Sequence, residues 1–247
     1  MPDLFLSPST QEYNLYYDGS GSEEYYMNRI ADAMEPYLVA SGISFVRNDP
    51  NGTVGDSVRR SNADNYKLHL ALHSNASGSA NYGRQRGSDV YYYASSTRGK
   101  AAASLFANNL KAIYPDPSRV RPVPTTSLYE LRATRAVALL LELAYHDNAD
   151  DAEWIKSNVR GIARNLALSV AEYLGVPLVD PAPLRTAVVR TQGSNLNIRE
   201  KPSTSSAILG KLPNGTEITV TGDAGDWYTI EYNGISGYVY GQYLAFS

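Results

Sequence analysis

Apolar and polar residues follow two different patterns along the first 176 residues. Short apolar runs such as Leu68–Leu72 and Val137–Leu143 are typical of buried strands, whereas Glu23–Ser41 repeats apolar residues at helical spacing. Strand and helix patterns alternate, which predicts an α/β domain over residues 1–176 with a mostly parallel central sheet flanked by helices. The other predicted strands are 4–7, 43–47 and 89–93, and the other predicted helices are 98–113 and 150–174.

The pattern changes after residue 176. Residues 177–186 contain three prolines and no helical period, so we predict a semi-rigid linker there. Short β-type segments separated by turn-forming residues then predict a small β-barrel over residues 187–247. Its predicted strands are 196–199, 208–212, 217–221, 227–232 and 237–240.

Composition excludes several classes of function. The net charge of −3 and the lack of any Lys/Arg run argue against a nucleic-acid partner. The chain has no cysteine, which excludes disulfides, a thiolate zinc site and a cysteine nucleophile. The amino-terminal residues lack the basic and apolar regions of a signal peptide, and no apolar stretch is long enough to span a membrane, so we expect no membrane segment.

One carboxylate lies near the end of an apolar run. Residues 136–143 are apolar except for Glu142, and a run of this kind predicts a strand covered on both faces. Burying an unpaired carboxylate is costly, and ligands in α/β sheets bind at the carboxyl ends of strands. Glu142 is therefore a candidate active-site acid or base. The alternative is a structural carboxylate held by a backbone amide, Arg132 or Arg135.

The helix predicted to begin near Ser22 carries a second candidate. Glu24 lies three residues before Met27 and seven before Ala31, which places it on the predicted core-facing stripe. Glu23 is then expected to face solvent and to complement the helix dipole. We therefore predict that Glu24 points inward.

A third candidate is His73, which follows the strand Leu68–Leu72 and opens a polar loop. His69 lies four residues earlier, so in a strand the two histidines are about 13 Å apart at roughly 3.3 Å per residue and cannot bind one metal ion. In a helix they could share a metal, but the glutamate of the HExxH pattern is absent after His69.

These candidates occur in an order that resembles a known family. Residues 128–151 contain a Leu-Arg pair, the apolar strand that ends at Glu142, then an Asn and an Asp before the last helix. They resemble the final motif of zinc-dependent N-acetylmuramoyl-L-alanine amidases. Glu24 with Met27-Asn28, residues 72–76 and residues 87–92 match the earlier landmarks of that family, so the resemblance spans about residues 3–175.

The resemblance implies a zinc hydrolase. Glu24 and His73 would hold Zn²⁺, and Glu142 would be the general base and acid. The bond cut would be the amide between N-acetylmuramic acid and the L-alanine of the peptidoglycan stem peptide. The remaining predicted site residues contact substrate and are Asn75, Arg132 and His146.

The first strand departs from the family pattern. The family places a zinc-binding histidine after this strand, but residues 6–14 contain no histidine. We predict that the side-chain oxygen of Gln11 replaces it, with Thr10 and Glu12 as alternatives, and that zinc affinity is lowered as a result. His146 is a further candidate to reach the metal from the loop after Glu142.

Residues 187–247 resemble a bacterial SH3 domain, in the segments that begin at Leu196, Asn214, Trp227 and Gly237. This resemblance implies binding to the cell wall, and a barrel without a ligand is the alternative. The whole chain is thus expected to hydrolyse peptidoglycan at the bacterial wall, in the manner of an endolysin released through a separate pore or of an autolysin with a removed leader. Two other functions stay open, a wall-binding protein with a degenerate metal site and a zinc peptidase acting within the stem peptide.

Overall fold

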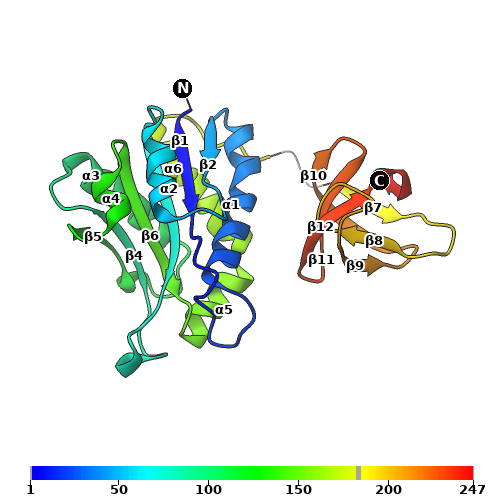
Figure 1. The fold of residues 1–247 in the computed structure, drawn as a ribbon, viewed down its shortest axis with the longest axis horizontal. Helices are drawn as coiled ribbons and strands as arrows, with labels where there is room; N and C mark the ends of the chain where they lie inside the picture. Colours follow the sequence, from blue (N-terminus) through cyan, green and yellow to red (C-terminus); the bar gives the residue numbers. More distant parts are fainter. Residues whose placement is uncertain (1, 182–184, 247) are drawn as a thin grey trace. The chain divides into compact units, whose positions relative to one another are not determined.

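The computed structural model describes residues 2–181 and 185–246, without the side chains of residues 223 and 224. The chain forms two compact units, Met1–Asp180 and Pro181–Ser247. Figure 1 shows a first unit of helices and strands and a second unit built mainly of strands.

The first unit is built on a six-stranded sheet with the order β2-β1-β3-β6-β4-β5. Neighbouring strands are parallel except for β4 and β6, which are antiparallel. The prediction of a mostly parallel sheet is therefore confirmed. The strands are β1 (Leu4–Pro8), β2 (Phe45–Arg47), β3 (Leu68–Asn75), β4 (Ser88–Tyr93), β5 (Val120–Thr125) and β6 (Val137–Tyr145).

Helices cover both faces of the central strands. The helices α1 (Glu23–Ala40), α3 (Thr97–Lys111) and α6 (Val159–Leu174) share the main hydrophobic core with alternate residues of β3 and β6, among them Leu139 and Leu141. The intervening residues Ala138 and Leu140 pack on the other face, against Leu131 of the short helix α4 (Tyr129–Ala133). Side chains alternate between the faces of a strand, so burial on both sides explains why β6 is apolar except for Glu142 and why residues 68–72 of β3 are apolar except for His69.

Three elements of this unit were not predicted, and one predicted helix is divided. The helix α2 (Val54–Asn62) is polar, β5 contains two prolines, as edge strands tolerate, and α4 has only five residues. The predicted helix 150–174 is two helices, α5 (Ala149–Ser157) and α6, because Asn158 leaves the helical conformation and ends α5.

The second unit is a seven-stranded sheet with the order β13-β7-β10-β11-β12-β8-β9, whose paired strands are all antiparallel. Its small core includes Val189, Ile198 and Ile230. Strand β7 begins at Arg185, inside the predicted linker 177–186, and residues 182–184 of that linker lie outside the described residues. The strands are β7 (Arg185–Val189), β8 (Leu196–Arg199), β9 (Ile208–Leu212), β10 (Glu217–Ala224), β11 (Trp227–Tyr232), β12 (Ile235–Tyr240) and β13 (Leu244–Phe246).

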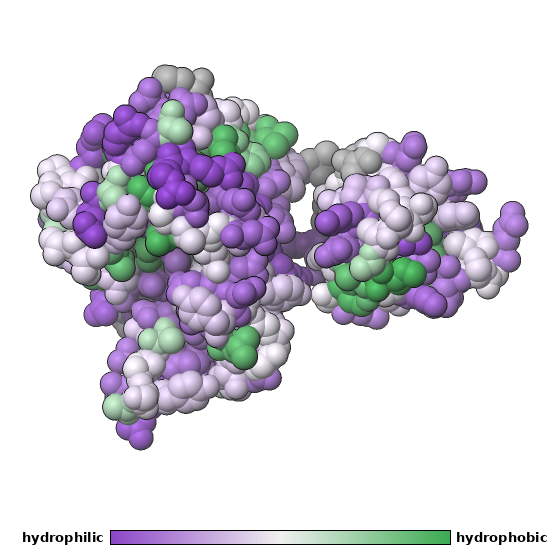
Figure 2. All heavy atoms as spheres, in the orientation of Figure 1, coloured by the Kyte–Doolittle hydropathy of each residue, from purple (hydrophilic) through white to green (hydrophobic). Residues whose placement is uncertain are grey.

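The surface of both units is mostly polar. Figure 2 shows polar residues over most of the visible face, with apolar residues in small patches. Within the described residues, no helix has the length and apolar character needed to cross a bilayer.

Asp151 connects the two antiparallel strands of the sheet to α5. Its fully buried carboxylate accepts hydrogen bonds from the backbone N–H groups of Gly87 (3.0 Å) and Tyr145 (3.1 Å), from the Tyr114 hydroxyl (2.6 Å) and from Arg86 Nε (3.0 Å). Gly87 precedes β4 and Tyr145 ends β6, so one side chain fixes the sheet edge at which both strands meet.

We expect Asp151→Asn to lower the free energy of unfolding by about 3 kcal/mol, because the amide loses the charge and one acceptor and leaves buried donors unpaired. Urea unfolding followed by circular dichroism at 222 nm measures this, since helices α1 to α6 all belong to the first unit. Asp150→Asn is the matched control: the Asp150 side chain is 70% exposed and binds only one atom of Arg86, so we expect a loss below about 1 kcal/mol. Equal unfolding midpoints for the two variants would contradict this role of Asp151.

Candidate active site

The site lies at the sheet edge where β3 and β6 end. Glu142 of β6 is paired in register with His73 of β3 on one side and with Asp89 of β4 on the other. Parallel pairing of β3 with β6 thus brings together two of the predicted site residues. The two lie 69 positions apart in the sequence, and strand register alone makes them neighbours.

The glutamate that reaches His73 is Glu23, so the predicted orientation of Glu24 was wrong. Glu23 is 2% exposed, and its Oε1 lies 2.7 Å from Nδ1 of His73. Glu24 is less buried than Glu23 and instead accepts a hydrogen bond from Asn28, which also donates to the carbonyl of Ser9. Glu23 also fits the core-facing stripe, since it lies four residues before Met27 and seven before Ile30. Both glutamates therefore fit the spacing of the stripe, and this spacing alone does not decide between them.

Gln11 approaches the same atoms from the segment that joins β1 to α1. Its Nε2 lies 3.3 Å from Glu23 Oε1 and 3.4 Å from His73 Nδ1, while its Oε1 accepts hydrogen bonds from Tyr13 and Asn14. Asn14 also donates to Glu23 Oε2 at 2.7 Å, so Gln11, Asn14 and Glu23 form one hydrogen-bonded group around His73. For the other two proposed third ligands, Thr10 and Glu12, no side-chain contact with His73 or Glu23 is seen within the described residues.

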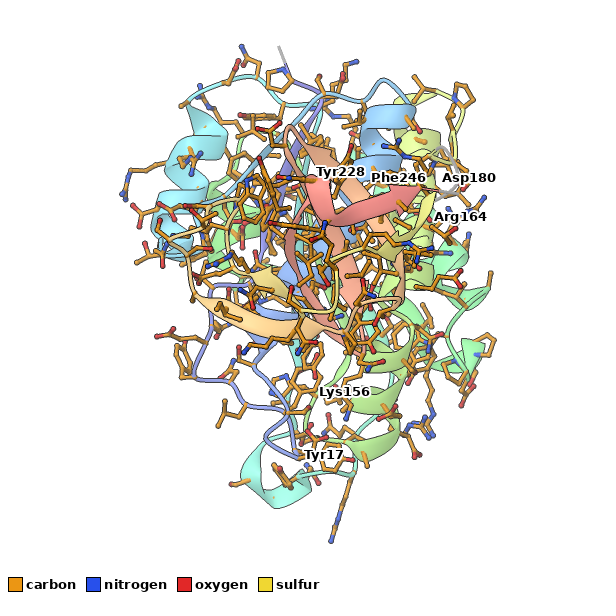
Figure 3. All side chains as sticks on the ribbon, turned by 90° about the vertical axis from the view of Figure 1, so that its right-hand side faces the viewer. Tyr17, Lys156, Arg164, Asp180, Tyr228 and Phe246 are labelled. Carbon is orange, nitrogen blue, oxygen red and sulfur yellow. The ribbon has the colours of Figure 1, made fainter. Side chains whose placement is uncertain are left out.

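The segment that carries Gln11 is anchored at its far end. Lys156 of α5 forms an ion pair with Asp18 at 2.6 Å. Its ammonium group also lies over the ring of Tyr17, and both residues are labelled in Figure 3. Tyr16 is buried between Tyr26 and His146, with ring centroids 4.4 and 5.5 Å away. These contacts hold the segment against the sheet edge and so position Gln11.

A buried network that the sequence gave no reason to expect lies behind His73. Glu130 of α4 is 4% exposed, and its Oε1 accepts hydrogen bonds from Ser7 (2.6 Å) and from Nε2 of His69 (2.8 Å). Its Oε2 lies 3.8 Å from Nε2 of His73. Nδ1 of His69 contacts the hydroxyl of Ser61 in α2. His73 is therefore held between two buried carboxylates, Glu23 at Nδ1 and Glu130 at Nε2.

Burial and the neighbouring carboxylates shift the pKa values of His73 and Glu142. Burial opposes the charged form of His73, but Glu130 and Glu23 outweigh it and raise its pKa to about 10. Burial raises the pKa of Glu142 to about 7, with a counteracting effect of His73 and a further rise from Glu23 and Asp89. Oε2 of Glu142 is buried and has no hydrogen-bond partner among the described residues. A proton acceptor is thus available at the sheet edge.

The three residues predicted to contact substrate lie in different environments. Asn75, at the end of β3, is half-buried and accepts a hydrogen bond from His146 N through its carbonyl. His146 is only 4% exposed and its Nδ1 contacts Ser74, a position that favours a structural role over contact with substrate or metal. Arg132 is exposed on α4 and stacks on Tyr129, at the end of β6 opposite to Glu142.

The donor atoms around His73 are compatible with a metal ion. Within residues 2–181 and 185–246, no three His, Cys, Asp or Glu side chains gather closely enough to hold one. Beside Glu23 and His73, the Gln11 side chain carries a further oxygen donor, Oε1, which now accepts hydrogen bonds from Tyr13 and Asn14. Nδ1 of His73 lies 2.7 Å from Glu23 Oε1, and Nε2 of the Gln11 amide lies 3.3 and 3.4 Å from these two atoms. An atom at the place of this nitrogen is near the roughly 3.3 Å expected between tetrahedral zinc ligands.

Two family models match the chain. One, described as N-acetylmuramoyl-L-alanine amidase, matches residues 13–173, and the other, described as a bacterial SH3 domain, matches residues 194–245. Among curated proteins, the putative N-acetylmuramoyl-L-alanine amidase YrvJ of Bacillus subtilis (strain 168) is 43% identical over 51 residues, which are 21% of this chain and 10% of that protein. The chain therefore matches about a tenth of the length of that relative.

Solved structures share the fold of the first unit. The catalytic domain of CwlV, an N-acetylmuramoyl-L-alanine amidase from Bacillus (Paenibacillus) polymyxa var. colistinus, has a TM-score of 0.58 at 20% identity, over 72% of this chain and 100% of that one. The CwlD amidase from Clostridioides difficile, solved in complex with the GerS lipoprotein, has a TM-score of 0.62 at 15% identity, over 71% and 99% of the two chains. At these identities the likeness establishes the fold. Because the matched residues 13–173 are more than half of the 247 residues and include Glu23, His73 and Glu142, the chain belongs to the N-acetylmuramoyl-L-alanine amidase family.

Proposed function

We propose that this protein is a zinc-dependent peptidoglycan amidase that hydrolyses the bond between N-acetylmuramic acid and the L-alanine of the stem peptide. The observation that carries the proposal is a buried carboxylate, Glu142, beside the Glu23–His73–Gln11 donor set in a chain of the amidase family. Its second unit matches a bacterial SH3 domain, which supports action at the cell wall through a tethered binding domain.

Three side chains of the site would hold the zinc ion. They are His73 through Nδ1, Glu23 through a carboxylate oxygen and Gln11 through its amide oxygen. When bound there, zinc would polarise the scissile carbonyl and lower the pKa of the attacking water. Rotation of the Gln11 amide would give up its present contacts with Tyr13 and Asn14. We therefore expect weaker zinc binding than with an imidazole at this position.

Glu142 would move the proton. Its unpartnered Oε2 can accept a proton from the attacking water and donate it to the departing L-alanine nitrogen. A pKa of about 7 suits both steps, since the carboxylate and the carboxylic acid are then both accessible at neutral pH. Asp89, the register neighbour of Glu142, is paired with Arg121 and is less available as a base.

A non-catalytic wall-binding protein is the second candidate. The direct hydrogen bond between Glu23 and His73 favours it, because this contact satisfies both groups without a metal ion. The two functions differ in zinc content and in the release of stem peptides from cell walls. Less than about a tenth of an equivalent of zinc, together with no peptide release, would favour binding alone.

Glu142→Gln is expected to lower kcat for cleavage of N-acetylmuramyl peptides by at least about 100-fold, because the amide cannot accept the proton. Zinc content should stay unchanged, since Glu142 is not among the proposed ligands. Liquid chromatography of the released peptides and elemental analysis measure the two quantities. Glu153→Gln, at a side chain 63% exposed on α5, is the matched control and should retain full activity. Retained activity of Glu142→Gln would refute its role as base.

Glu23→Gln and Glu24→Gln form a matched pair that tests the ligand assignment. Glu23→Gln should lower zinc affinity by at least tenfold, since a charged ligand becomes a neutral one, whereas Glu24→Gln should leave zinc affinity unchanged because its carboxylate is directed to Asn28. Competition with a chromogenic chelator measures zinc affinity. In the same assay Gln11→His should bind zinc more tightly than the wild type. A loss of zinc in Glu24→Gln alone would assign the ligand to Glu24.

Glu130→Gln tests whether the buried carboxylate behind His73 orients this ring. Partners of the second ring nitrogen fix the tautomer of a metal-binding histidine, and their loss typically lowers metal affinity about 10–100-fold. We expect such a loss of zinc affinity and a changed His73 tautomer in ¹⁵N NMR spectra of the metal-free protein. Ser7→Ala removes another partner of Glu130 and controls for general damage to the network. Unchanged ring shifts and affinity in Glu130→Gln would exclude the positioning role.

A further inference from the structure

A pocket of about 180 Å³ lies at the end of β6 opposite to Glu142. It is lined by Tyr93 at the end of β4, by Arg98 in the first turn of α3, by Arg132 of α4, and by Thr134 and Arg135 from the segment that connects α4 to β6. We call it the arginine pocket. It is separate from the donor atoms around His73, and the amidase site described above does not use it.

The arginine pocket has the chemistry of an anion site. No Asp or Glu is among the described residues that line it, and none of its three arginines forms an ion pair with a carboxylate of the described chain. Other arginines of this domain, Arg47 and Arg86, do have carboxylate partners. The Oγ1 atom of Thr134 is buried and has no hydrogen-bond partner. Arg98, Arg135 and the unpaired hydroxyl are therefore available to a bound anion, while the guanidinium group of Arg132 also stacks on Tyr129. Arginine binds carboxylates in a bidentate manner.

The arginine pocket and Glu142 lie on the same face of the sheet. In the antiparallel pair β4–β6, Asp89 is opposite Glu142, and Tyr91 is opposite Leu140. The same register places Tyr93, at the end of β4, opposite Ala138, near the start of β6. These residues share one face because side chains alternate along a strand. Four residues separate Glu142 from Ala138, which is about 13 Å at roughly 3.3 Å per residue. Helix α4 covers Ala138 and Leu140 on this face, whereas Tyr91 and Tyr93 lie at the margin of that cluster and are only partly buried, so the part of the face over β4 keeps side-chain surface exposed.

We propose that the arginine pocket binds the carboxyl-terminal carboxylate of the stem peptide whose amide bond is cut at Glu142. This proposal rests on the proposed function. An extended peptide spans at most about 3.3–3.6 Å per residue, so four residues cover about 13–14 Å, the separation of Glu142 from the pocket. The peptide would lie along β4 over Tyr91 and Tyr93, with its first residue at Glu142 and its last in the arginine pocket.

Three substrates and one double variant test this proposal. The substrates are N-acetylmuramyl-L-alanine, N-acetylmuramyl tetrapeptide and the same tetrapeptide with a carboxyl-terminal amide. We expect the wild type to cleave the tetrapeptide acid with a kcat/KM at least tenfold above that for the amide. Arg98→Ala/Arg135→Ala should lose this preference because its KM for the tetrapeptide acid rises. The same variant should cleave N-acetylmuramyl-L-alanine as the wild type does.

A matched double variant removes the same charge elsewhere. Arg59→Ala/Arg119→Ala changes two exposed arginines on other parts of the domain and should keep the preference for the acid. Circular dichroism checks that both double variants are folded. Equal cleavage of acid and amide by the wild type, or an equal loss on all three substrates in Arg98→Ala/Arg135→Ala, would overturn the proposal.

Binding measurements separate this proposal from the proposed function. Calorimetry with the free tetrapeptide does not require hydrolysis, so a wild type that cleaves nothing refutes the function while still testing the pocket. Binding of the free acid but not of its amide, lost in Arg98→Ala/Arg135→Ala, supports the pocket. Inorganic phosphate is the second probe, because phosphate polymers of cell walls carry the same anion chemistry. Binding of phosphate without any preference for the peptide acid would overturn the assignment to the stem peptide.

Discussion

The site depends on one imidazole ring that is held between two buried carboxylates. Glu23 contacts Nδ1 of His73 at 2.7 Å, and Glu130 lies 3.8 Å from Nε2. A third carboxylate, Glu142, is the register neighbour of His73. Carboxylates are costly to bury without a compensating positive charge. The arrangement is therefore stable only if a cation, either a proton or a metal ion, is present among these side chains.

The two ways of supplying that charge have different consequences. Without a metal ion, Glu130 and Glu23 raise the pKa of His73 to about 10 against the opposing effect of burial, so the ring carries the positive charge at neutral pH. Burial raises the pKa of Glu142 to about 7, although His73 acts in the opposite direction. A metal ion would take the place of the proton at Nδ1 of His73 and draw Glu23 and Gln11 toward the same point. Gln11, like a neutral histidine, brings no charge to the site. With Gln11 as the proposed third ligand, the departure from the family pattern would change the strength of one ligand and leave the charge balance unchanged.

The strands that carry the site could be predicted from the sequence because their signals are local. Apart from His69 and Glu142, the runs 68–72 and 137–143 are apolar because both faces of these strands are covered, and the polar stretches after them mark their carboxyl ends. Glu23 could not be separated from Glu24 with certainty, because both lie within reach of one helical stripe and the packing of α1 on the sheet decides between them. The residues next to Glu130 in the sequence gave no indication that its carboxylate is buried beside His73. Its partners Ser7 and His69 are 123 and 61 residues away, so only the folded chain shows its role.

The short helix α4 links the two ends of the proposed substrate path. Five residues cannot form a stable helix alone, so α4 depends on its contacts. Leu131 packs on Ala138 and Leu140, and Asn62 donates to the carbonyl of Ala133 and accepts from the backbone of Arg135. The same contacts therefore position Glu130 behind His73 and the arginines at the far pocket. A change that loosens α4 would disturb the chemistry at one end of β6 and peptide binding at the other, although neither Leu131 nor Asn62 needs to touch the substrate.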